Sequence, residues 1–197
     1  MNHVISVNRQ VTVTKIALCG KLRAGKDEVA KHLSIWYGFD RFAFGDELKR
    51  IYHEINPWVP ADTKPRAEYQ RFGQAMRDIC GDDIWIRHAE RKINNAIDTE
   101  INVGKDRIGI VVTDLRQPNE YEWARANGFT IVRVTAPDEL RLARAKKAGD
   151  DFTESDLAHS TEQWVDKFDV DFEIVNDGLL DELWAKVDDV MAKIYSS

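Results

Sequence analysis

The sequence predicts a three-layer α/β fold, with a parallel sheet of about five strands and helices on both faces. One observation is that short apolar runs, typical of buried parallel strands, alternate with amphipathic helical patterns along the chain. The other is that no internal repeat and no linker rich in Pro, Gly or Ser divides the 197 residues. We therefore expect a single domain over residues 1–197.

The first elements are a strand at Ile16–Cys19, which Val11 and Val13 extend, and a helix that follows a glycine-containing loop. Gly38 is expected to end this helix, and a second strand is expected at residues 39–44. One face of the helix is expected to carry Val29, Ala30, Leu33, Trp36 and Tyr37.

The rest of the chain continues the alternation. Further helices are expected at 46–56, 66–80, 83–101, 118–128 and 138–148, and further strands at 108–112, 129–134 and 172–175. The final helix carries a core-facing stripe of Leu179, Leu180, Leu183, Trp184, Val187, Val190, Met191 and Ile194.

Composition narrows the class of protein. A hydrophobic content of 43% and a charged content of 31% are typical of soluble globular proteins, and the net charge of −6 argues against a nucleic-acid partner. No apolar stretch approaches membrane-spanning length and no signal-peptide core begins the chain. Cys19 is expected to be a reduced core residue. These features favour a cytoplasmic protein with no membrane partner.

The loop after the first strand has phosphate-loop spacing, with Gly20, Gly25 and Lys26 between the strand and the helix. Glycines allow backbone N–H groups to turn inward around a polyphosphate, and the helix N-terminus adds a positive dipole. We expect Lys26 to be a solvent-facing group that reaches the terminal phosphates. An ordinary strand-to-helix turn is disfavoured because strand, loop, lysine and helix occur in the required order.

Asp27 occupies the position after the lysine, where the usual motif has Ser or Thr. A carboxylate is a hard oxygen ligand, so Asp27 is a candidate ligand of Mg²⁺, directly or through water. The alternative is an acid that only complements the helix dipole. The sequence leaves both open.

Asp114 and Arg116 follow the apolar run at 108–112, at the strand end where ligands bind in open parallel sheets. Asp114 is the candidate acid that orients Mg²⁺, with a cap for the following helix as the alternative. Arg116 is a candidate to bind a substrate phosphate through its planar guanidinium, or else forms a surface ion pair.

Arg141 and Arg144 lie three residues apart on the helix expected at 138–148. On a lid, they would neutralise charge on a transferring phosphoryl group. The alternative is a solvated helix face. Closer to the acceptor side, Gln74, Arg77, Asp83 and Trp85 mix amide, charged and aromatic groups suited to a nucleotide, although Trp85 is equally consistent with a core residue.

Five stretches together resemble the phage-type deoxynucleoside monophosphate kinases, a branch of the P-loop nucleotide kinases. They are spread over most of the chain, and the ending Gly-Lys-Asp of the first is itself a trait of that branch. Gly45 departs from the family's more familiar alanine, and the lid has fewer arginines than expected. The stretches are residues 20–27, 42–49, 82–86, 113–120 and 175–178.

The resemblance implies a nucleoside monophosphate kinase-like fold with a core over 11–44, 103–136 and 166–197, an acceptor-binding region over 45–102 and a lid over 137–165. It implies that Lys26 and the lid arginines, Arg141 and Arg144, act on the transferred phosphoryl group, while Asp27 and Asp114 remain the candidate Mg²⁺ residues on the grounds given above. The implied ATP-binding residues are Gly20, Lys21, Leu22, Arg23, Ala24, Gly25, Lys26, Asp27 and Asn176. The expected substrate-binding residues are Asp46, Leu48, Lys49, Gln74, Arg77, Asp83, Trp85, Arg116, Asn119 and Glu120.

The reaction implied is phosphoryl transfer from ATP to a (deoxy)nucleoside 5′-monophosphate, in the cytoplasm of the host if a phage encodes the chain. A monophosphate is largely ionised at neutral pH, so no general base is required. One alternative is an enzyme like dephospho-coenzyme A kinase, in which Asp46 would act as base on a hydroxyl. Another is a nucleotide-binding switch module. Family members are often homodimers, but no interface signature in the sequence decides this point.

Overall fold

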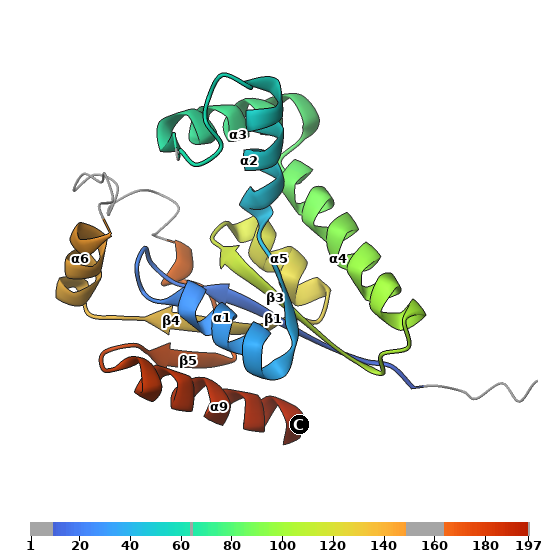
Figure 1. Ribbon diagram of the computed structural model, residues 1–197, viewed down its shortest axis with the longest axis vertical. Coiled ribbons are helices and arrows are strands. Elements are labelled where there is room, and N and C mark those ends of the chain that lie inside the picture. Colours follow the sequence, from blue (N-terminus) through green and yellow to red (C-terminus); the bar gives the residue numbers. More distant parts are fainter. Residues whose placement is uncertain (1–9, 64, 149–163, 197) are drawn as a thin grey trace, which may run out of the picture.

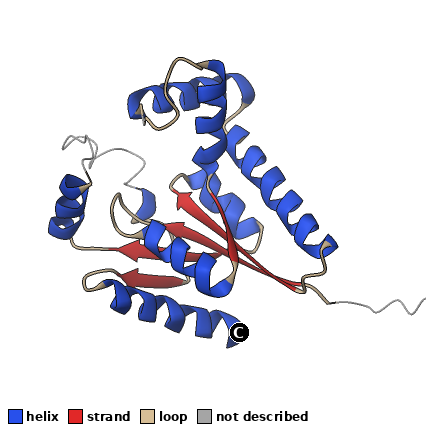
Figure 2. Cartoon of the chain, viewed as in Figure 1, coloured by secondary structure: helices blue, strands red, loops and turns tan. Residues whose placement is uncertain are grey.

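A single parallel sheet forms the centre of the molecule. The computed structural model describes residues 10–63, 65–148 and 164–196, and its strands lie in the order β2-β3-β1-β4-β5, all parallel (Figures 1 and 2). The predicted α/β class and the five parallel strands are thereby confirmed. The strands are β1 (Thr12–Cys19), β2 (Phe39–Phe42), β3 (Arg107–Leu115), β4 (Thr130–Thr135) and β5 (Phe172–Val175).

Helices cover both faces of the sheet. α1 and α9 pack on one face and α4 and α5 on the other, while α2 and α3 form a lobe that projects beyond the sheet (Figure 1). The described helices are α1 (Lys26–Tyr37), α2 (Phe44–Ile55), α3 (Arg66–Cys80), α4 (Ile84–Asn102), α5 (Pro118–Ala126), α6 (Asp138–Lys147) and α9 (Leu180–Ser196). Each lies within a few residues of a predicted helix. Residues 149–163, most of the predicted lid, lie outside the described residues.

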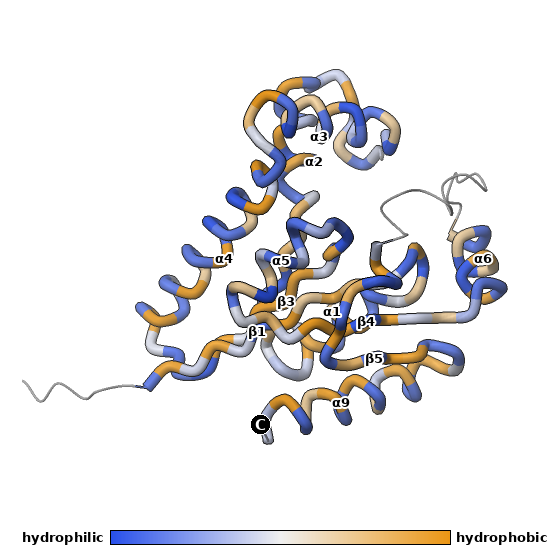
Figure 3. Tube along the Cα trace, turned by 180° about the vertical axis from the view of Figure 1, so that it is seen from behind, coloured by the Kyte–Doolittle hydropathy of each residue, from blue (hydrophilic) through white to orange (hydrophobic). Residues whose placement is uncertain are grey.

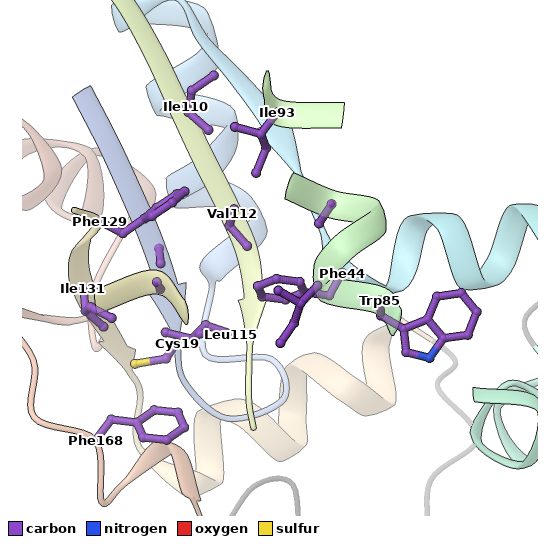
Figure 4. Packing of buried hydrophobic residues seen from close by; sticks show 14 of the residues in the cluster. Cys19, Phe44, Trp85, Ile93, Ile110, Val112, Leu115, Phe129, Ile131 and Phe168 are labelled. Atoms are coloured by element: carbon purple, nitrogen blue, oxygen red, sulfur yellow. The ribbon is translucent and has the colours of Figure 1, made fainter. Parts of the chain in front are cut away.

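The strands divide their side chains between two hydrophobic clusters. Ala17 and Cys19 of β1 enter the cluster beneath α4 and α5, whereas Ile16 and Leu18 enter the cluster beneath α1 and α9. This division follows from the two-residue period of a strand. Figure 3 shows hydrophobic residues along the central strands and at intervals along the helices, and Figure 4 shows the cluster around Cys19. The prediction that Cys19 is a free core residue is confirmed.

Some predicted core positions are exposed instead. Trp36 is 71% exposed, because the last turn of α1 faces the core with Tyr37, which packs against the cluster beneath α1 and α9, and turns Trp36 outward. Leu179 precedes the first residue of α9 and is 73% exposed, and Leu180 is 43% exposed. No helix among the described residues has the length and apolar character of a membrane span.

Candidate active site

All five strands deliver residues to the same edge of the sheet. β1 runs into the loop at residues 20–25, β2 into α2, β3 into the turn after Leu115, β4 into α6, and β5 into Asn176. In a parallel sheet the carboxyl ends of the strands form the edge at which ligands bind. The candidate residues that follow the strands therefore come to this edge from segments far apart in the sequence.

The glycines of the loop are required by its backbone conformation. Gly20 and Gly25 have φ of +144° and +109°, values that residues with a Cβ rarely adopt. A Cβ at Gly20 would lie 2.1 Å from the carbonyl oxygen of Val134, and one at Gly25 would lie 2.2 Å from Nδ2 of Asn176. The loop thus passes close against β4 and the residue after β5.

Lys26 turns into this loop. Its Nζ donates to the carbonyl oxygens of Gly20 at 2.6 Å and Lys21 at 3.0 Å, and the residue is only 9% exposed. The expectation of a solvent-facing lysine is wrong, because the loop folds around the ammonium group and supplies it with acceptors. The ammonium group therefore stands among the loop carbonyls at the start of α1.

Arg141 and Arg144 of α6 both reach the loop. Arg141 is buried and donates from Nη1 to the carbonyl of Leu22 at 3.0 Å, while its Nη2 binds Asp138 at 2.8 Å. Arg144 donates from Nη1 to the carbonyl of Arg23 at 3.5 Å. The alternative of a solvated helix face is wrong for Arg141, because the loop packs over it.

Asn176 lies beneath the loop, where it is 6% exposed. Its Nδ2 donates to the carbonyl of Ala24 at 2.9 Å, and its Oδ1 accepts from Nη2 of Arg144 at 3.2 Å. The asparagine therefore links the loop to α6. The structure places it as a support of the loop backbone, and a contact with the adenine of ATP stays a prediction.

A charged hollow lies beside the loop. Lys21 forms an ion pair with Asp166 at 2.8 Å, and Arg133 donates to the carbonyl of Val165 at 3.1 Å. The hollow is lined by Gly20, Lys21, Ala24, Arg133, Val134, Thr135, Ala136, Asp138, Arg141 and Asp166. The sequence reasoning missed Arg133 and Asp166, since neither belongs to a recognisable motif and only the fold brings them to the loop.

On the other side of the edge, Asp114 binds the start of α2. Its Oδ1 accepts from the backbone N–H of Phe44 at 2.8 Å and its Oδ2 from that of Gly45 at 3.0 Å. The sequence-based alternative was that Asp114 caps the helix that follows it, which is α5. Asp114 is a cap, but the helix that it caps is α2. Asp46 of the same helix pairs with Arg41 at 3.1 Å, and its Oδ1 lies 4.0 Å from Nζ of Lys49.

Glu120 and Asn119 shape the turn after β3. The buried Oε2 of Glu120 accepts from the backbone N–H groups of Arg116 at 2.8 Å and Gln117 at 2.9 Å. Burial, and secondly the Asp114 carboxylate, raises the pKa of Glu120 to about 7. Asn119 donates to the carbonyl of Asp82 at 3.1 Å. Both predicted substrate residues therefore hold backbone, whereas the side chain of Arg116 is exposed at this edge.

Trp85 is placed differently from the nucleotide-stacking prediction. It is 2% exposed, packs against Phe72 and His88, and donates from Nε1 to the carbonyl of Gly73 at 3.2 Å. Its ring faces the seam between α3 and α4, so no face is open to a base. The alternative of a core residue is the one observed.

The other predicted acceptor residues line the helices of the lobe. Leu48 is half-buried against Gly73, and Arg77 of α3 is half-buried on the side that faces Glu120. Gln74 and Asp83 are exposed; Gln74 donates to Asp78 at 2.8 Å, and Asp83 pairs with Arg87 at 3.2 Å. Arg77 is thus near the strand edge, whereas Gln74 makes its described contact on the surface of α3.

The residues present suit Mg²⁺ only in part. The described residues contain no group of three or more His, Cys, Asp or Glu side chains arranged to hold a metal ion. Mg²⁺ in phosphoryl-transfer sites uses one or two carboxylates together with substrate phosphates. Asp27 fits that use, since it is exposed in the first turn of α1 beside the loop. Asp114 fits less well, because two of its roughly four lone-pair sites are already used by the amides of Phe44 and Gly45.

Comparison with known proteins agrees with this geometry. The AAA domain family matches residues 16–164. The chain belongs to this family. It is also 36% identical over 150 residues to the deoxynucleotide monophosphate kinase of Escherichia phage RB69, a match that covers 66% of this chain and 52% of that protein. The chain spans about half the length of this relative. The predicted resemblance to phage-type deoxynucleoside monophosphate kinases is confirmed.

Solved structures of similar fold include several kinases. Shikimate kinase from Acinetobacter baumannii, in complex with shikimate, superposes with a TM-score of 0.51 at 18% identity, covering 92% of this chain and 94% of that one. Shikimate kinase from Aquifex aeolicus vf5 gives 0.51 at 13% identity, covering 91% and 96%. TT1252 from Thermus thermophilus gives 0.50 at 18% identity, covering 93% and 98%. At these identities the likeness shows the P-loop kinase fold alone.

Proposed function

We propose that the protein transfers a phosphoryl group from ATP to a (deoxy)nucleoside 5′-monophosphate, giving ADP and the nucleoside diphosphate. One observation carries the proposal: Arg141 and Arg144 reach the phosphate loop from α6. A loop that only binds a nucleotide has little use for two guanidinium groups beside it. Phosphoryl transfer needs them, because negative charge is spread over the transferring group. The name of the phage relative supports the same chemistry.

The donor side supplies cations and amides. The backbone N–H groups of the loop and the dipole of α1 attract the phosphates. In the structure described here, Lys26 is bound to the carbonyls of Gly20 and Lys21. We infer that its ammonium group exchanges these acceptors for phosphate oxygens when ATP binds. That exchange leaves no buried charge unpaired.

Asp27 would hold Mg²⁺ together with phosphate oxygens, and the ion would supply further neutralisation of phosphate charge. On the acceptor side, Lys49, Arg77 and Arg116 provide positive charge around the strand edge. They would orient the monophosphate, which is itself the nucleophile and needs no general base. The protein's contribution is therefore positioning and charge.

An ADP-release assay tests the proposal directly. ATP and Mg²⁺ are held constant, and deoxynucleoside and ribonucleoside monophosphates are supplied one at a time. We expect at least one to stimulate ADP release, with Lys26→Ala reducing that rate at least 100-fold. Lys31→Ala removes an exposed lysine of the same helix and serves as the matched control. Stimulation by none of the monophosphates would contradict the proposal and favour the switch module.

The alternative activity, phosphorylation of a hydroxyl group by an enzyme like dephospho-coenzyme A kinase, requires Asp46 to act as a base. If Asp46 were a base, Asp46→Asn would abolish turnover while nucleotide binding remained intact. Under our proposal, Asp46→Asn instead leaves measurable turnover, because the acceptor arrives ionised. Binding of the nucleotide is followed separately by calorimetry, so that a loss of turnover is assigned to chemistry.

A further inference from the structure

The start of α2 lacks a capping side chain of its own. Ala43 occupies the N-cap position and makes no side-chain cap hydrogen bond, and alanine is a poor N-cap. The first N–H groups of a helix have no partner within the helix, and their dipoles leave partial positive charge at this end. α2 therefore needs an acceptor from elsewhere in the chain.

Asp114 provides that acceptor from the neighbouring strand. Phe42 of β2 pairs with Val112 of β3, so Phe44 and Asp114 each lie two residues beyond the paired positions. The Asp114 carboxylate is thereby opposite the first turn of α2, where it accepts the two amides of Phe44 and Gly45 at 2.8 and 3.0 Å. Its charge also complements the dipole of the helix.

Gly45 makes this approach close. A Cβ at Gly45 would lie 3.3 Å from Oδ2 of Asp114, which is tighter than ordinary van der Waals contact. A side chain at this position would press on the carboxylate that caps the helix.

Two predicted acceptor residues depend on this junction. Asp46 and Lys49 belong to the first two turns of α2, and the Lys49 Nζ lies 3.9 Å from where a Cβ of Gly45 would be. Glu120 holds the neighbouring turn that carries Arg116. Together, the two carboxylates fix α2 and Arg116 relative to the end of β3.

We propose that Asp114 is a positioning residue for the acceptor nucleotide: it caps α2 from β3 and thereby holds the first turns of α2, which carry Lys49, at the end of β3, where Arg116 follows. This inference rests on the proposed function and assigns Asp114 a role different from the Mg²⁺ ligand that the sequence indicates. A cap acts on the lobe that receives the acceptor. A metal ligand acts on ATP and Mg²⁺.

Kinetics of Asp114→Asn separate these roles. The amide of asparagine replaces one acceptor oxygen with an N–H group, which cannot accept the second backbone amide. We expect the KM for the acceptor to rise at least tenfold, with the KM for ATP and the half-saturating Mg²⁺ concentration changing less than twofold. Asp181→Asn, an exposed acid in the first turn of α9, is the matched control. A raised Mg²⁺ requirement with an unchanged acceptor KM would overturn the proposal.

Gly45→Ala provides a second test that removes no carboxylate. Its added Cβ would lie 3.3 Å from Oδ2 of Asp114 and requires that carboxylate to shift by a few tenths of an ångström, so the acceptor KM is expected to rise about threefold or more, without a change in Mg²⁺ dependence. Amide hydrogen exchange at Phe44 and Gly45 is read by NMR on the full chain, independently of any activity. Exchange at least tenfold faster in Asp114→Asn than in Asp181→Asn supports the cap. Equal exchange rates in Asp114→Asn and Asp181→Asn would refute the capping role of Asp114, whether or not the protein is a kinase. An absence of acceptor-stimulated turnover in the unaltered protein would refute only the proposed kinase activity.

Discussion

Replacement of Gly25 by alanine should destabilise the protein for two separable reasons. Gly25 has φ +109°, outside the range of ordinary residues, and a left-handed conformation costs an L-residue about 1–2 kcal/mol. The new Cβ would also lie 2.2 Å from Nδ2 of Asn176. Moving that amide breaks its hydrogen bond to the buried carbonyl of Ala24, and an unpartnered buried polar group costs about 1–3 kcal/mol.

The expected loss is therefore about 2–5 kcal/mol in the free energy of unfolding, a large part of the roughly 5–15 kcal/mol typical of a domain. Urea unfolding followed by circular dichroism measures it. Gly38→Ala is the matched control: Gly38 also has a positive φ, +70°, but a Cβ there meets nothing within 4 Å. The control should lose only the backbone part, about 1–2 kcal/mol.

A double-mutant cycle with Asn176→Ala isolates the steric part. Once the asparagine is removed, alanine at position 25 no longer meets it, so the two losses should overlap by about 1–3 kcal/mol. Additive losses, or a loss in Gly25→Ala no larger than in Gly38→Ala, would refute the contact between loop and asparagine as its cause.

Two further predictions concern titration and thiol chemistry. Glu47 is buried, and its pKa is lowered to about 2. The hydrogen bond from Arg50 lowers this pKa most, and Lys92 lowers it further; burial acts in the opposite direction but is outweighed. Because the pKa is depressed on folding, Glu47 stabilises the fold fully above about pH 4.5 and loses that contribution as the pH falls toward 2. At pH 7 the free energy of unfolding of Glu47→Gln should be lower than that of the unaltered protein by about 1–3 kcal/mol, and near pH 2 the two should be nearly equal, as measured by urea unfolding at each pH. The same difference at both pH values would contradict the pairing of Glu47 with Arg50 and Lys92. Cys80 is exposed, whereas Cys19 is buried, and burial is the main cause that raises the pKa of Cys19 to about 11. A thiol reagent should therefore label only Cys80 rapidly in the folded protein, and both cysteines after unfolding. Rapid labelling of both cysteines in the folded protein would contradict the buried position of Cys19.

Local patterns predicted most of the fold. The helices at α3 and α4 and the strand β5 follow from periodicity and from proline and glycine positions, which act over a few residues. β2 ends at Phe42, two residues before its predicted end, because Phe44 donates its N–H group to Asp114, 70 residues away, and begins α2.

The direction of side chains was predicted less well. The stripe of α9 is correct at Leu183 and Met191, which face the sheet, but fails at Leu179, before the first turn of the helix. Hydrophobic spacing indicates which face of a helix is apolar, but it does not indicate how much of the length of that face is covered by neighbouring elements. The same limit explains Trp85, for which a core position and a base-stacking position have the same sequence pattern.

The sequence by itself determined the succession of strands and helices along the chain and the resemblance to phage-type deoxynucleoside monophosphate kinases, because these depend on contiguous residues. Only the tertiary structure decided that Lys26 turns into the loop, that Arg141 is buried against Leu22 and that Asp114 caps α2. The physical reason is that the partner of a charged group is set by which strand ends meet at one edge of the sheet. That adjacency arises when the strands pair, and no short segment contains it.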